Sequence, residues 1–149
     1  MSRVVTKRVK LHGLEGMIHI RVGILQPGEA HEGDGMTVGA IAETHEFGLG
    51  SVPERSFIRA WFDLNARPFA RFARDQMALG FKRGSVLRGA ELVAVKAAAD
   101  MRNRITEGLE PELAESTERD KVRRGKRPPY KPLIDRGVLR NSIAGHAFE

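Results

Sequence analysis

One stretch decides the fold of this chain: Ser85-Val-Leu-Arg-Gly-Ala-Glu-Leu-Val-Ala-Val-Lys-Ala-Ala-Ala-Asp-Met-Arg-Asn-Arg-Ile105. Its apolar residues recur every three or four positions, which is the spacing of one face of an α-helix. Ser85 can cap the first turn by accepting a hydrogen bond from a free backbone amide. The stretch therefore predicts a long helix with one buried stripe. The stripe consists of Val86, Ala90, Val93, Ala97, Met101 and Ile105.

A short helix is expected upstream, between Thr37 and Gly48. Thr37 is a suitable N-cap, and Gly48 can adopt the left-handed conformation that ends a helix. The helical spacing places four residues on one apolar face: Val38, Ile41, Ala42 and His45. We therefore expect His45 to be partly buried and hydrogen-bonded rather than catalytic.

A second helix is expected to begin at Ser51-Val-Pro-Glu54, which has the spacing of a capping box. Arg59 and Asp63 would form an ion pair on its exposed side. Asn65 and Pro68 predict a break in this helix and a restart after it. Its aromatic residues are expected to belong to the core: Phe57, Trp61, Phe62, Phe69 and Phe72.

Strands are expected at both ends of the chain. Residues 17–25 alternate between apolar and other side chains, as in a strand with one buried face. Residues 5–11 would pair with them in a hairpin, and residues 142–148 alternate enough to form a last strand. The predicted fold class is α+β: a small antiparallel sheet packed against a layer of helices, with mobile loops.

The length of 149 residues suits a single domain spanning residues 1–149. A flexible loop is expected at 26–35, which is rich in Gly and Pro, and a flexible arm at 110–132.

The absence of cysteine excludes thiol catalysis, disulfides and cysteine-ligated zinc. The sequence contains no apolar run long enough for a membrane span, and residues 1–10 do not resemble a secretory signal. We expect no membrane contact, and synthesis in the cytoplasm.

The positive charge is concentrated at one end of the chain. Residues 121–149 contain eight basic and two acidic residues, an excess equal to the whole net charge of +6. Such a segment attracts nucleic acid, and Tyr130 could stack on a base. It attracts an acidic protein surface equally well, including the acidic stretch 31–46 of a neighbouring copy. The candidate residues for contact with a partner or DNA are Lys121, Arg123, Arg124, Lys126, Arg127 and Lys131.

No catalytic residue, metal site or cofactor is predicted. The candidates were His31 with Asp34 and His45 for a metal-dependent hydrolase, His45 with Glu46 as a general base, and Ser142 with His146 as a nucleophile pair. The first set lacks a recognised ligand spacing. The second pair consists of adjacent helical residues, which point about 100° apart. The third pair would lie about 13 Å apart along a strand. The chain is therefore expected not to be an enzyme.

Two segments together resemble a known family. Thr37-Val-Gly-Ala-Ile-Ala-Glu-Thr-His-Glu-Phe-Gly48 is followed by Val52-Pro-Glu-Arg-Ser-Phe-Ile-Arg-Ala60, and later comes Lys131-Pro-Leu-Ile-Asp-Arg-Gly-Val-Leu-Arg-Asn-Ser-Ile143. They resemble signatures of the tail-completion and neck (head–tail joining) proteins of long-tailed double-stranded DNA phages, which are related to the Mu-type virion morphogenesis proteins. Arg136 stands where the second signature usually has Thr.

The resemblance implies that the motif residues are structural. Phe47 and Phe57 would pin the loop between Gly48 and Pro53 to the core, while Asp135 would cap a helical turn. The full set is His45, Glu46, Phe47, Gly48, Pro53, Arg55, Phe57, Pro132, Leu133, Asp135, Gly137, Leu139 and Ser142.

The resemblance also implies a function in the virion. The chain would form a homo-oligomeric ring in the neck, after assembly in the host cytoplasm. It would contact the head connector or adaptor and the tail terminator or tail tube, and could also contact genomic DNA in the lumen. The alternative function is a small basic nucleic-acid-binding protein.

Overall fold

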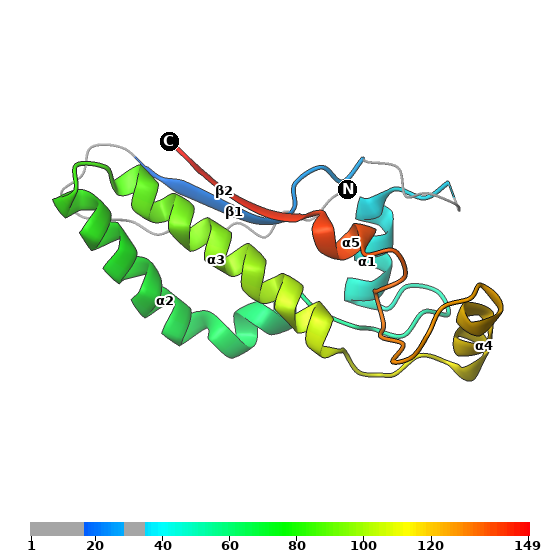
Figure 1. Cartoon of the computed structure of the whole chain (residues 1–149). Helices are drawn as coiled ribbons and strands as arrows, with labels where there is room; N and C mark the ends of the chain where they lie inside the picture. Colours follow the sequence, from blue (N-terminus) through cyan, green and yellow to red (C-terminus); the bar gives the residue numbers. More distant parts are fainter. Residues whose placement is uncertain (1–16, 29–34) are drawn as a thin grey trace.

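Helix α3 (Val86–Glu107) is the central element of the structure. A computed structural model describes residues 17–28 and 35–149, which form an α+β fold (Figure 1). Helix α3 lies between α2 (Arg59–Lys82) and a two-stranded sheet, so it is covered on two sides (Figure 1). The hydroxyl of Ser85 accepts a hydrogen bond from the amide of Arg88 at 3.3 Å, which confirms the predicted N-cap.

Helices α2 and α3 pack closely because glycine faces backbone at their contact. A Cβ atom added to Gly89 would lie 2.4 Å from the carbonyl oxygen of Gln76, and one added to Gly80 would lie 2.6 Å from that of Ser85. No larger residue fits at such distances without moving the backbone. The close approach of another helix therefore depends on glycine as well as on the predicted alanines.

The sheet joins segments from opposite ends of the described chain. Strand β1 (His19–Ile24) pairs antiparallel with β2 (Ile143–Phe148), with His19 opposite Phe148 and Ile24 opposite Ile143. Both predicted strands are confirmed. The proposed partner strand at 5–11 lies outside the described residues, within which the partner of β1 is β2.

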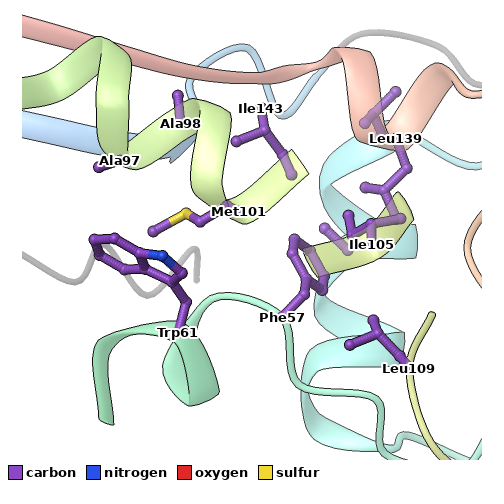
Figure 2. Close-up of a cluster of buried hydrophobic side chains, with 11 residues drawn as sticks. Phe57, Trp61, Ala97, Ala98, Met101, Ile105, Leu109, Leu139 and Ile143 are labelled. Carbon is purple, nitrogen blue, oxygen red and sulfur yellow. The ribbon is translucent and has the colours of Figure 1, made fainter. Parts of the chain in front are cut away.

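The main core surrounds the C-terminal half of α3 (Figure 2). Phe57, Met101 and Ile143 are fully buried, and Trp61 packs edge-on against Phe62 and Phe69. A second, smaller cluster lies between α2, α3 and the sheet: Met77, Ala90 and Ala147. The predicted stripe of α3 is confirmed from Ala90 to Ile105, while Val86 is half-buried at the edge of the second cluster.

Helix α2 differs from the prediction at its start and in its middle. It begins at Arg59, eight residues after Ser51, and the residues between them form an irregular connection rather than a helical turn. It also continues through Pro68, which lies on the exposed side. Asn65 lies within this helix and donates a hydrogen bond to the carbonyl of Trp61 at 2.9 Å. The axis bends in the N-terminal half of the helix (Figure 1), and this half contains Pro68, which lacks the backbone N–H of a helical hydrogen bond.

Helix α1 (Val38–Phe47) precedes α2, and two shorter helices complete the described part of the chain. Helix α4 (Glu115–Arg123) lies within the stretch predicted as an arm, where no helix was expected. Helix α5 (Val138–Asn141) follows Gly137, whose φ of 78° allows the sharp entry. No side chain caps α5, so the prediction that Asp135 caps this turn is wrong. The flexibility of loop 26–35 and of arm 110–132 stays a prediction, and residues 29–34 lie outside the described part.

Candidate functional site

The carboxylate of Glu46 organises the first motif segment. Glu46 lies near the end of α1 (Val38–Phe47), which Thr37 caps and Gly48 ends as predicted, and it is only 5% exposed. One carboxylate oxygen accepts hydrogen bonds from the amides of Phe57 and Ile58, at 2.9 and 3.0 Å. The other accepts from the amide of Arg59 at 2.8 Å. The free amides at the start of α2 are thus satisfied by a side chain from another helix.

The guanidinium of Arg59 covers the same carboxylate. It donates to Glu46 at 3.2 Å and to the carboxylate of Glu54 at 2.8 Å, so the predicted pairing with Asp63 is wrong. Its central carbon lies 4.6 Å from the centre of the Phe47 ring, a cation–π contact. Phe47 is therefore half-buried beneath Arg59 rather than inserted in the core, whereas Phe57 is buried as predicted.

Arg55 joins the first motif segment to the chain that follows α3. It is 5% exposed, and its guanidinium donates to the carbonyls of Pro111 and Glu112 at 2.6 and 2.7 Å. Its amide donates to the carbonyl of His45 at 2.7 Å. Burial, and secondarily the positive charge of Arg55, lower the pKa of His45. His45 is partly buried as predicted, but its buried Nδ1 has no hydrogen-bond partner, so the predicted hydrogen bond is not seen.

Gly48 is required for the connection between α1 and α2. Its φ is 63°, and a Cβ atom there would lie 2.8 Å from the amide nitrogen of Glu54. The chain after Gly48 therefore folds back against the end of α1, with Pro53 exposed in the extended segment. This arrangement agrees with the turn predicted at Gly48.

The second motif segment packs beside the first. Pro132 is buried, Leu133 is half-buried against the main core, and Leu139 on α5 is buried within it. Ser142 donates from its hydroxyl to the carbonyl of Val138 at 2.8 Å and so closes α5. Figure 2 shows Leu139 and Phe57 on either side of Ile105 near the end of α3. Residues about 80 positions apart in the sequence therefore share one core.

Basic residues within α4 and in the segment after it line a pocket of about 210 Å³. Its walls also include an aromatic ring, two apolar residues and one carboxylate. The lining residues are Lys121, Lys126, Arg127, Pro129, Tyr130, Lys131, Ile134 and Asp135. Four of the six predicted contact residues thus meet in one place, although they span ten positions of sequence.

Lys121 differs from the other basic residues because it is internal. It is 6% exposed, and its ammonium donates to the carbonyls of Lys131 and Ile134 at 3.3 and 2.8 Å. Burial is the main cause that lowers its pKa. Lys121 therefore holds the 131–134 loop against α4 and also lines the pocket, while its contact with a partner or DNA stays a prediction.

Asp135 is held by the basic residues instead of capping α5. It accepts a hydrogen bond from Arg124 at 2.8 Å, and its carbonyl accepts one from Lys126 at 3.1 Å. Burial by itself raises the pKa of Asp135, but the hydrogen bond and charge of Arg124 hold it below its usual range. Arg124 also pairs with Asp120 at 2.9 Å, as does Arg123. Arg123 and Arg124 therefore brace α4 outside the pocket.

Sequence reasoning missed the pocket because its walls depend on the fold of residues 126–135. The spacing of Asp120 and Arg124, four residues apart, was a readable sign of α4. No sequence pattern near Pro129 or Ile134 indicated that they would line a pocket with the lysines.

Within the described residues, no group of three or more His, Asp or Glu side chains could hold a metal ion, and no helix is long and apolar enough to cross a membrane. His31 and Asp34 lie outside those residues.

Comparisons with protein-family models, with characterised proteins and with solved structures find no match to this chain. The likeness to phage neck proteins therefore depends on the motif residues themselves.

Proposed function

We propose that this chain is a structural protein of the neck of a long-tailed DNA phage. It completes the tail and joins it to the head connector by assembling as a homo-oligomeric ring. Its neighbours are the connector or adaptor on one side and the tail terminator or tail tube on the other. It is built in the host cytoplasm, becomes part of the virion and acts by assembly rather than catalysis.

One observation carries the proposal: the residues of both sequence signatures meet at the same end of α3. Glu46 and Phe57 from the first signature and Leu139 from the second contribute to one local structure, in which α1 and α5 are in contact. This packing supports a shared structural role for the two signatures. Their roles are those of a scaffold, because the motif side chains hold helix ends, turns and core.

The decisive experiment is immuno-electron microscopy of purified phage particles from the source of this chain, with an antibody against it. Label confined to the junction between head and tail is the expected result. Mass spectrometry of the same particles should detect its peptides in an amount consistent with one ring per virion. Particles with neither neck label nor peptides of this chain would overturn the proposal.

A further inference from the structure

We propose that the pocket between α4 and residues 126–135 binds a phosphate group of a nucleic-acid strand. Its lining contains four cationic side chains and one carboxylate, and that carboxylate is already paired with Arg124 outside the lining. An excess of positive charge around a half-enclosed space favours an anionic ligand. The inference is independent of the neck role, because it concerns binding by the isolated protein.

The cationic groups are held in place before any ligand arrives. The ammonium groups of Lys121, Lys126 and Lys131 each donate to a backbone carbonyl, with Thr106 as the acceptor for Lys131. An ammonium group has three N–H donors, so each retains at least one for a ligand. Since these side chains are already ordered, binding loses less side-chain entropy than it would on a free lysine tail.

Arg127 supplies the remaining donors. It is exposed at the rim of the pocket, and no hydrogen bond or ion pair of its side chain is seen within the described residues. The ring of Tyr130 forms a wall beside it, fixed by a hydrogen bond from its hydroxyl to the carbonyl of Lys126 at 3.0 Å. A base next to the bound phosphate could therefore contact an aromatic surface that is already ordered.

The arrangement suits a phosphate of a strand better than an acidic segment of a protein. Three lysines and one arginine line the space, and the ordered ring of Tyr130 beside them offers a stacking surface that suits a nucleotide base rather than an acidic side chain. The exposed Arg127 adds a cation that no described side chain neutralises, which a strand of phosphates can contact. The acidic stretch 31–46 is also a weaker partner than its composition indicates, because the carboxylate of Glu46 is buried in the cap of α2.

The test measures binding of a fluorescently labelled single-stranded DNA of about 20 nucleotides by anisotropy over a range of salt concentrations. Wild-type protein should bind at low salt, and NMR shift changes should concentrate at residues 121–135. Arg127→Gln should weaken binding several-fold and reduce the slope of log K against log salt by roughly 1. Arg127→Lys should restore most of the affinity because it restores the charge.

Arg119→Gln is the matched control. Arg119 is an exposed arginine of α4 that lies outside the pocket lining and pairs with Glu115. Its replacement by glutamine lowers the net charge by the same amount as Arg127→Gln. It should change the affinity much less than Arg127→Gln. Circular dichroism of each variant checks that the fold is retained.

Three results would overturn the proposal. The first is no DNA binding by the wild-type protein at low salt. The second is an equal loss of affinity in the Arg127→Gln and Arg119→Gln variants, which would indicate diffuse surface charge rather than the pocket. The third is tighter binding of a poly-glutamate peptide than of DNA of the same charge, with NMR shift changes again at residues 121–135. That result would mean that the pocket accepts a protein carboxylate.

Discussion

At the scale of single residues, the buried carboxylate of Glu46 performs the work that an N-cap side chain usually performs. The residue at the N-cap position of α2 is Ile58, which has no side-chain hydrogen-bond acceptor. Glu46 reaches these amides from α1 because Gly48 reverses the chain between the two helices. The start of α2 thus depends on a residue that precedes it by more than ten positions.

Replacement of Glu46 by alanine should lower the free energy of unfolding by about 3 kcal/mol, because several amides and the Arg59 guanidinium lose a charged acceptor. Hydrogen exchange at Phe57–Arg59 should become faster than in the rest of α2. Denaturant unfolding and native-state hydrogen exchange measure the two effects.

Glu43→Ala is the control, since Glu43 is an exposed residue of the same helix. Its effect should stay within about 0.5 kcal/mol. If both substitutions cost the same, Glu46 does not hold the start of α2.

At the scale of elements, α3 has two close contacts that only glycine permits: one with α2 and one with β2. Gly89 faces the backbone of α2, and Gly145 on β2 faces the backbone of α3. A Cβ atom on Gly145 would lie 2.1 Å from the carbonyl oxygen of Ala94. The sheet therefore lies unusually near the α3 backbone at this position, and the closeness cannot be relieved by a side-chain rotation.

Gly145→Ala should destabilise the protein by at least 1–3 kcal/mol, the usual cost of overpacking, because β2 must move away from α3. Thermal unfolding should show a reduction in Tm of several degrees. Gly28→Ala is the matched control: Gly28 has no atom within 4 Å of an added Cβ. A Gly145→Ala variant as stable as the Gly28→Ala variant would contradict the close packing.

At the scale of the whole molecule, contacts between distant segments hold together the end that carries both motif segments and the pocket. The pocket lies between α4 and the loop that leads to α5, and this loop packs on the main core through Leu133 and Ile134. Arg55 ties the α1–α2 connection to Pro111 and Glu112, which lie between α3 and α4. The position of α4 should therefore depend on Arg55.

Arg55→Ala should lower the free energy of unfolding by about 2 kcal/mol, since two backbone carbonyls lose a charged donor. Trypsin should cleave near residues 119–127 faster under native conditions, because α4 loses its attachment. The exposed Arg67 on α2 provides the control, and Arg67→Ala should leave both measurements unchanged. Equal cleavage rates in the two variants would contradict the role of Arg55.

The sequence by itself determined the elements whose signals are local. The stripe from Ala90 to Ile105, the caps at Thr37 and Ser85 and the stop at Gly48 depend on residues within a few positions of one another, and all are confirmed. The alternation in 17–25 likewise predicted β1, because a strand with one buried face needs only a period of two.

The tertiary structure alone decided the long-range pairings. Ser51-Val-Pro-Glu54 had the local pattern of a helix start, but the hydrogen bonds that the amides of residues 57–59 donate to Glu46 place the start later. Asp135 likewise pairs with Arg124 instead of capping α5. Lys121 became internal and part of a pocket only because residues 131–134 fold over α4. Charge and capping patterns identify which groups can bond, whereas the packing of segments far apart in the chain determines which groups meet.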